Sequence, residues 1–190
     1  MTPASLLLPT YADMLSALAA WLDKAEREVG PDQADALMRA RLAPDMFPLA
    51  TQVRFACVQA LEGVHRLARQ DFPPLVQALL DEGRGASDNP GTISEARARI
   101  AQTRDLAAKA AADIPAETDP QAPLEHRLPI GIVFDLTVEQ YVRDWALPQF
   151  YFHLMAAYAI LRAAGVPLGK ADYVQHMFAY VRPGTMPPAG

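Results

Sequence analysis

The chain has 190 residues, 51% of them hydrophobic, and a mean hydropathy of +0.01, which is enough to bury the core of one soluble globular domain. Its net charge is −5 and no cluster of Lys and Arg occurs, which argues against nucleic-acid binding. The single cysteine, and an N-terminus that resembles neither a signal peptide nor a membrane span, predict a cytoplasmic protein without membrane association.

The first part of the chain predicts two helices and a break. Thr10 followed by Asp13 is typical of a helix N-cap, and an amphipathic pattern continues from there to Gly30. A short helix is expected over residues 32–40. The two prolines of residues 41–49 exclude a continuous helix there, and the second of them suits the first position of the next helix.

Two long helices are predicted in the middle of the chain. The first continues to about residue 69, and residues 71–91, rich in Pro, Gly and acidic residues, predict a long surface connection. Thr92 and Glu95 form the capping-box pattern that opens the second of these helices. Its apolar stripe is mostly alanine, so it can approach its neighbours closely.

The last third of the chain predicts a hairpin followed by an apolar helix. Strand-like runs at residues 124–128 and 132–136 flank a Pro-Ile-Gly turn. The next helix begins at a capping box, is kinked or restarted by Pro148, and ends before Gly165. Residues 145–165 carry almost no charge, so this helix is expected to be buried on nearly every side.

Together these elements predict an all-α fold. The expected architecture is a four-helix bundle over residues 1–170, with a long crossover between its second and third helices and a small β-hairpin before the last. Residues 171–190 are expected to form a C-terminal extension, consisting of a short helix and a flexible Pro/Gly tail.

Histidine spacing gives no metal motif. The four histidines include no HxxxH, HExxH or ExxH pair; they are His65, His126, His153 and His176. His153 and His65 could converge from different helices, with Asp45, Asp135 or Asp144 as a carboxylate ligand. The plainer interpretation is that His153 is a buried, hydrogen-bonded core residue. We therefore predict no metal and no other cofactor, with His153 as a weak candidate ligand.

Other catalytic patterns are equally sparse. Cys57 lies next to a core stripe, where a cysteine is usually inert, and no Gly-x-Ser-x-Gly sequence is present. Asp45 and Asp144 are candidates for an acid–base pair, although Asp45 also suits a helix N-cap. The segment Gly83-Arg-Gly85 is interpreted as a turn and not as a phosphate-binding loop.

The last helix carries more aromatic residues than can all face one core. At helical spacing they face several directions; they are Trp145, Phe150, Tyr151, Phe152 and Tyr158. Some of them are expected to line a pocket or a dimer interface, where Tyr and Trp are enriched.

Four sequence blocks resemble those of a known family. They are Ala40-Arg-Leu-Ala-Pro-Asp-Met-Phe-Pro-Leu49, Ala146-Leu-Pro-Gln-Phe-Tyr-Phe-His153, Ala157-Tyr-Ala-Ile-Leu-Arg162 and Gly165-Val-Pro-Leu-Gly-Lys170. The chain resembles, from Tyr11 to Asp172, an uncharacterised bacterial family of unknown function within the DinB/YfiT-like superfamily. The resemblance implies an up-down-down-up bundle with a long crossover, and a homodimer.

The same resemblance bears on metal chemistry. Many DinB-like proteins are similar to divalent-metal enzymes, including thiol-dependent transferases, with one histidine on the second helix and an HxxxH pair on the last. His153 would match one of that pair, but Gln149 and Ala157 stand one turn either side of it. The resemblance therefore implies an incomplete three-histidine site.

The leading hypothesis is a protein that binds a small, largely apolar molecule in a pocket between helices. The candidate pocket residues are Asp45, Phe47, Gln149, Tyr151 and His153, because polar groups set in an apolar wall are typical of ligand sites. The alternatives are a metal- and thiol-dependent transferase or hydrolase, and a dimeric interaction protein without enzymatic activity. No catalytic residue can be assigned from the sequence, which leaves open whether the chain is an enzyme.

Overall fold

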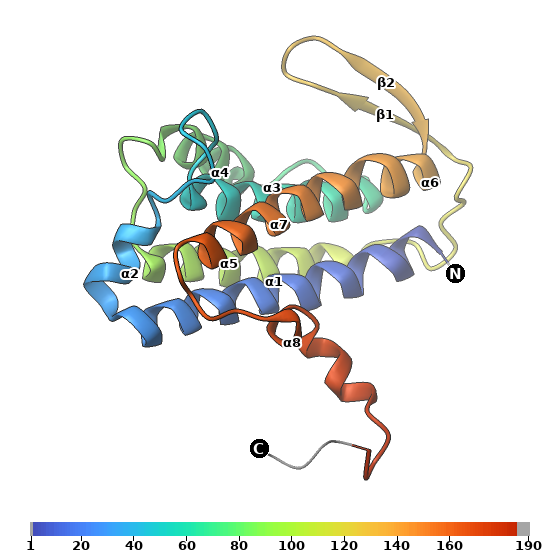
Figure 1. Ribbon diagram of the computed structural model, residues 1–190. Coiled ribbons are helices and arrows are strands. Elements are labelled where there is room, and N and C mark those ends of the chain that lie inside the picture. Colours follow the sequence, from blue (N-terminus) through green and yellow to red (C-terminus); the bar gives the residue numbers. More distant parts are fainter. Residues whose placement is uncertain (1, 186–190) are drawn as a thin grey trace.

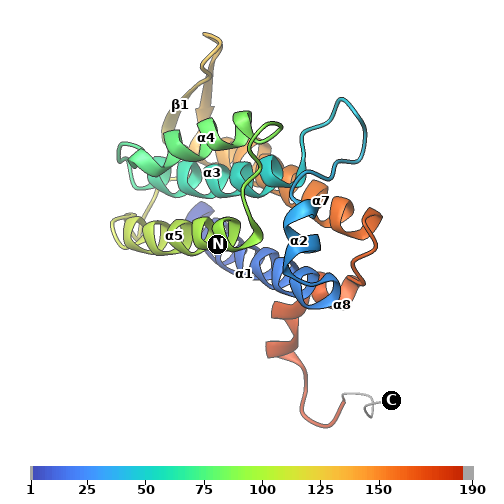
Figure 2. The same ribbon diagram turned by 90° about the vertical axis from the view of Figure 1, so that its left-hand side faces the viewer.

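Four long helices lie side by side and form the body of the molecule (Figure 1). In the computed structural model, which describes residues 2–185, they are α1 (Pro3–Val29), α3 (Leu49–Leu67), α5 (Ile93–Ala111) and α7 (Leu147–Ala163). Figure 2 shows two layers, one of α3 and α7 and the other of α1 and α5. Since α3 packs against all three other helices, it supplies the centre of the core. The predicted all-α class is confirmed, with a small hairpin added to it.

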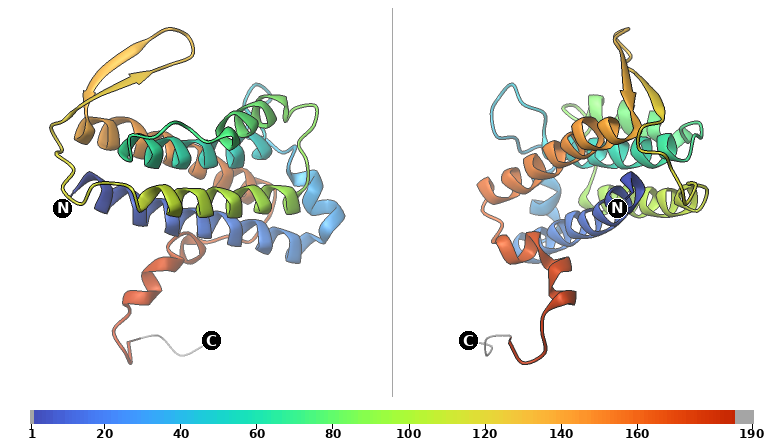
Figure 3. Two further views of the ribbon diagram at one scale, coloured as in Figure 1. Left: turned by 180° about the vertical axis from the view of Figure 1, so that it is seen from behind. Right: turned by 90° about the vertical axis from the view of Figure 1, so that its right-hand side faces the viewer.

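Shorter elements connect and extend these helices. They are α2 (Pro31–Leu37), α4 (Pro74–Gly85), β1 (Pro123–Arg127), β2 (Val133–Thr137), α6 (Val138–Gln140), the π-helix η1 (Tyr141–Ala146), α8 (Lys170–Tyr173) and the 3₁₀-helix η2 (Gln175–Tyr180). The two strands pair antiparallel, and His126 stands opposite Phe134. The predicted hairpin is confirmed, each strand lying one residue from its expected bounds. Its turn points away from the bundle (Figure 3).

The first helix begins about two turns earlier than predicted. Thr2 and Ser5 form a capping box, and a proline occupies the first turn, where its missing N–H has no helical partner to lose. Thr10, the predicted N-cap, lies inside α1, and its hydroxyl donates to the carbonyl of Leu6 at 2.8 Å. The capping signal at Thr10 was therefore wrong, because a stronger one lies upstream.

The apolar stripe of α1 belongs to the bundle core. In length and composition α1 is the one described helix that could cross a membrane, but its stripe packs against the other long helices. Tyr11 shows how closely: a Cβ on Gly63 of α3 would come within 2.6 Å of its hydroxyl oxygen. The same hydroxyl donates to the carbonyl of Ala146 at 3.3 Å. Tyr11 thus fixes α1 against both α3 and the end of η1.

The predicted surface connection over residues 71–91 contains a helix, α4. Its residues Val76 and Leu79 are buried, and the hydroxyl of Thr51 on α3 donates to the carbonyl of Gly83 at 2.7 Å. The prediction was wrong because the Pro and Gly residues of this segment were interpreted as breaks. Pro73 is the N-cap of α4 and the following proline occupies its first position, where proline is favoured.

The last helix, α7, begins at Leu147 with Pro148 in its first turn, which agrees with the predicted restart, and it follows η1 without a gap. Proline removes a donor and its ring conflicts with the carbonyl four residues earlier. The π-helix η1 comes immediately before, and the N–H of Leu147 donates to the carbonyl of Val142. This wider turn lets the proline remain inside one continuous helical segment.

One face of α7 is exposed, contrary to the predicted burial on nearly every side. The side chains of Phe152 and Met155 are 61% and 42% exposed, whereas Phe150 and Leu154 are buried. The structure places α7 at the edge of one layer, so only part of its circumference contacts the core. The helix α7 therefore carries more apolar side chains than are buried within the described residues.

The start of the C-terminal extension lies against α1. The indole N–H of Trp21 donates to the carbonyl of Asp172 at 3.1 Å, and the ammonium of Lys24 lies 3.0 Å from the Asp172 carboxylate. The ring of Tyr173 stacks on Trp21 with 5.9 Å between their centroids. Residues 186–190, part of the tail expected to be flexible, lie outside the described residues.

Candidate functional site

Two of the predicted pocket residues, Phe47 and His153, are brought together. The ring of Phe55 contacts both, at centroid distances of 5.8 Å from Phe47 and 5.3 Å from His153. Gln52 connects them as well: its Oε1 accepts from Nδ1 of His153 at 2.9 Å, and its Nε2 donates to the carbonyl of Phe47 at 3.3 Å. Burial lowers the pKa of His153 to about 4, so the ring is neutral at pH 7.

The other predicted residues are oriented differently. Asp45 is exposed in the loop before α3, and the N-cap of α3 is Pro48, so Asp45 caps no helix. Tyr151 is half-buried, and burial is the main reason that the pKa of its hydroxyl is raised. The nearby charge of Asp13 on α1 raises this pKa further, so Tyr151 lies on the face of α7 that is turned toward α1. Gln149 is half-buried on α7, one turn before His153. Asp144, the other candidate for acid–base work, is exposed and paired with Arg143 at 2.7 Å.

The residues present do not fit a three-histidine metal site. His65 lies thirteen residues beyond Gln52 on α3, or about 20 Å along a helix, so it cannot reach His153. Its Nδ1 donates to the carbonyl of Leu61 at 2.8 Å. Among the described residues, no group of three or more His, Cys, Asp or Glu side chains is placed to hold a metal ion.

A cleft of about 440 Å³ lies between α3, α4 and the hairpin, and we call it the hairpin cleft. Its walls are largely apolar and include Val58, Phe72, Pro73, Pro74, Val76, Leu80, Leu128 and Pro129. Its polar and charged residues are Gln59, Glu62, Arg66, Gln77, Arg84, His126 and Arg127, and Trp145 of η1 completes the lining. The cleft therefore combines an apolar wall with a few polar groups, as ligand sites do.

His126 is enclosed by aromatic rings at the hairpin side of this cleft. Its ring centroid lies 4.4 Å from that of Trp145, 5.5 Å from Tyr141 and 6.3 Å from Phe134. The residue is 2% exposed, yet neither ring nitrogen has a hydrogen-bond partner within residues 2–185. Burial, and then the positive charge of Arg66, lower its pKa to about 4. His126 is thus a neutral ring with one donor and one acceptor unused.

Two further buried donors line the same cleft without partners in the described structure. They are Nε1 of Trp145 and Nε of Arg66. The guanidinium of Arg66 is held over the ring of Phe72, 5.0 Å from its centroid, and Nη1 donates to the carbonyl of Glu125 at 3.2 Å. Such buried polar atoms are costly when unpaired and usually indicate a missing partner such as a ligand or water.

Glu62 adds an acidic group one helical turn before Arg66. Burial raises the pKa of the Glu62 carboxyl, and the charge of Arg66 opposes that rise. Burial also raises the pKa of the Tyr141 hydroxyl. The cleft therefore offers donors from Arg66 and Trp145, together with a carboxyl group, that of Glu62, whose pKa burial raises.

Sequence reasoning did not select Glu62, Arg66 or His126 as site residues. The Glu62–Arg66 spacing of four on one helix was a usable signal, since it places a charged pair on one face. His126 was weighed only as a metal ligand. Its burial follows from strand alternation, which turns every second residue of β1 toward the bundle.

The fold and the cleft define a DinB-like helical bundle. The solved structure of a DinB family member protein from Shewanella denitrificans is 31% identical in sequence, and the two chains superpose with a TM-score of 0.73 over 97% of this chain and 95% of that chain. Residues 5–174 match the family model described as Domain of unknown function (DUF1993). The chain belongs to this DUF1993 family, which confirms the resemblance predicted from the sequence. No curated protein matches the chain significantly.

Proposed function

We propose that the chain binds a small organic acid with an apolar body in the hairpin cleft. The observation that carries this proposal is the group of four buried nitrogen atoms without partners in the described structure, on Arg66, His126 and Trp145. All three residues line the same cleft. Three of these nitrogens are N–H donors, one on each residue, from which a carboxylate would accept, and the apolar wall would bury the rest of the ligand.

Charge supports an anionic ligand. Three arginines line the cleft against one glutamate. Arg84 and Arg127 already pair with Asp81 and Glu125, whereas Arg66 forms no ion pair within the described residues. A desolvated guanidinium held by an aromatic ring is a favourable site for a carboxylate.

Fluorescence of Trp145 tests this function. In a Trp21→Phe background only Trp145 reports, because the chain has two tryptophans. Octanoate and phenylacetate should change its emission and raise the melting temperature, while octanol and phenylethanol should do so much less. Arg66→Met should abolish the response, and Arg69→Met, at an exposed arginine that does not line the cleft, should preserve it. Equal responses to acids and alcohols would contradict the proposal.

We also propose a cytoplasmic homodimer that uses the exposed face of α7. Phe152 and Met155 form an uncovered apolar surface, and aromatic residues and methionine are enriched in protein interfaces.

The cytoplasmic location is supported by the single cysteine. Cys57 is buried and free, which suits a reducing compartment.

We further infer the up-down-down-up order of a DinB-like bundle. In Figure 1 the chain follows one direction along α1 and α7 and the opposite direction along α3 and α5. The segment containing α4 then serves as the crossover between α3 and α5.

A further inference from the structure

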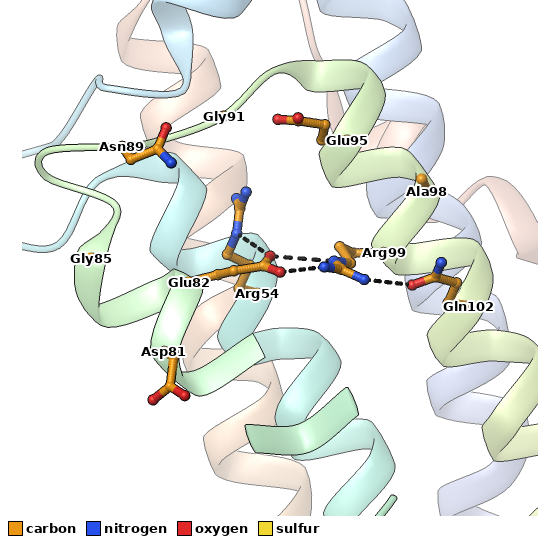
Figure 4. Close-up of a pocket in the computed structure, with 10 residues that line it drawn as sticks. All are labelled: Arg54, Asp81, Glu82, Gly85, Asn89, Gly91, Glu95, Ala98, Arg99 and Gln102. Carbon is orange, nitrogen blue, oxygen red and sulfur yellow. Dashed lines mark hydrogen bonds and ion pairs between the residues drawn. The ribbon is translucent and has the colours of Figure 1, made fainter. Parts of the chain in front are cut away.

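A second cavity, of about 420 Å³, lies between α3, α4 and the first half of α5 (Figure 4). The residues that would contact a ligand are Arg54, Asn89, Gly91 and Glu95, whereas Glu82 and Arg99, also in the lining, are bonded to each other. None of these residues lines the hairpin cleft. Its charged lining differs from the apolar wall of that cleft, so it would suit a different ligand.

Arg54 is a buried cation with donors left over. Its side chain is 4% exposed, its Nε donates to Glu82 at 3.1 Å, and its Nη1 donates to the carbonyl of Ala50 at 3.2 Å. A guanidinium has five N–H donors, and in the described structure Nη2 has no acceptor. Figure 4 shows this end of Arg54 directed toward the space between Asn89 and Glu95.

Arg99 offers a direct contrast. Its Nε and Nη2 both donate to Glu82, and its Nη1 donates to Oε1 of Gln102 at 2.9 Å. Two guanidinium groups thus share the single carboxylate of Glu82. Each nitrogen of Arg99 has a partner, so Nη2 of Arg54 is the one guanidinium nitrogen of the pair without a partner among the described residues.

Gly91 separates this cation from an anion. Its φ is +69°, and a Cβ placed on it would stand 2.9 Å from Nη2 of Arg54 and 2.5 Å from Oε2 of Glu95. The Glu95 carboxylate accepts from the N–H of Thr92 at 2.8 Å and forms no ion pair with any described residue. A side chain at residue 91 would collide with both charged groups, so glycine is what allows Arg54 and Glu95 to lie this close together at the cavity.

We propose that this cavity binds a small zwitterion that carries an α-amino-carboxylate group. The ligand's carboxylate would accept from Nη2 of Arg54, and its ammonium would lie against Glu95. A ligand with only a carboxylate would be repelled by Glu95, and one with only an amine would be repelled by Arg54. A ligand with both groups satisfies each of them.

Calorimetric titration of the full chain with alanine, propionate and ethylamine tests this proposal. Alanine should bind at least about tenfold more tightly than either single-charge analogue, because it makes two charge-assisted contacts. In Glu95→Gln, which preserves a capping-box residue, alanine should lose this advantage over propionate. Glycine, serine and glutamate extend the series to side chains of other sizes.

Arg54→Met and Arg99→Met form a matched pair. Each leaves Glu82 with one arginine partner, but only Arg54→Met removes the free donor, so only this variant should lose alanine binding. No binding of any of the four amino acids at millimolar concentration would overturn the proposal. So would equal binding of propionate and alanine, or unchanged binding by Arg54→Met. If Arg54→Met does not fold, the Glu95→Gln comparison decides the matter.

Discussion

Nδ1 of His153 lies 2.9 Å from Oε1 of Gln52, and this contact joins the most apolar helix of the chain to its central helix. The amide nitrogen of Gln52 donates in turn to the carbonyl of Phe47. One side chain thus connects α3, α7 and the loop before α3. His153 and Phe47 were predicted as pocket residues; that role stays a prediction, and the structure connects the two residues through Gln52.

Acid should destabilise the fold through its buried histidines. Burial lowers the pKa of both His153 and His126 from 6.5 to about 4. Between these values the unfolded chain binds protons that the folded chain does not, so the free energy of unfolding falls as the pH drops from 6.5 toward 4. We expect a loss on the order of 2–3 kcal/mol from each ring. Urea unfolding at several pH values between 6.5 and 4 measures this loss. If the free energy of unfolding of a His153→Gln variant fell as steeply with pH as that of the wild type, His153 would not be one of its causes.

Replacing His126 by phenylalanine should stabilise the free protein and weaken its ligand binding. The substitution preserves the aromatic packing on Trp145 and removes two unpaired ring nitrogens, a gain of about 1–3 kcal/mol. Chemical unfolding and titration with octanoate should therefore change in opposite directions. A destabilised His126→Phe chain would show that these nitrogens have partners, such as ordered water, in solution.

Gly63→Ala should destabilise the bundle by about 1–3 kcal/mol, because the added methyl group overlaps Tyr11. Gly85→Ala is the matched control. It also lies in a helix, and its Cβ would have no atom within 4 Å, so replacing this glycine should be neutral or stabilising by up to about 1 kcal/mol. Melting temperatures of the two variants compare them directly, and equal values would contradict the close approach of α1 to α3.

The proposed dimer should dissociate when charge is placed on the exposed face of α7. Phe152→Glu should shift the sedimenting species from dimer to monomer, because an unpaired charge in an apolar interface is costly. Phe178→Glu, in η2 and 46% exposed, is the control expected to remain dimeric. A wild-type chain that sediments as a monomer at micromolar concentration would exclude this interface.

Local sequence signals predicted most of the fold. The capping boxes at Thr92 and Thr137 and the glycine stop at Gly165 depend on a few neighbouring residues, and the structure confirms them. The predicted start of α1 was wrong because the cap pattern at Thr10 was preferred to the capping box at Thr2, and α4 was missed because Pro73 was interpreted as a break. Proline inside the first turns or at a cap is compatible with a helix, and only the surrounding packing distinguishes these cases.

The hairpin cleft could not be predicted in the same way. Its polar groups come from α3, α4, β1 and η1, and Glu62 and His126 are more than sixty residues apart in the chain. One wall of the cleft is α4, which the sequence did not reveal. An unpaired nitrogen is a property of three-dimensional surroundings, so neither His126 nor Trp145 could be distinguished from ordinary core residues beforehand.

The π-helix η1 keeps the buried residues before and after it on the same side of the helical segment. Every fourth residue is buried from Val142 through Ala146 and Phe150 to Leu154. This spacing of four residues is longer than the α-helical turn of about 3.6 residues. Over those twelve residues a regular helix would drift by about 120°, whereas one inserted residue corrects about 100° of that. Deleting a residue from η1 would therefore restore ideal hydrogen bonding and turn Trp145 away from the cleft. The π-helical turn therefore allows one continuous helical segment to pack against the bundle core at one end and against the hairpin at the other.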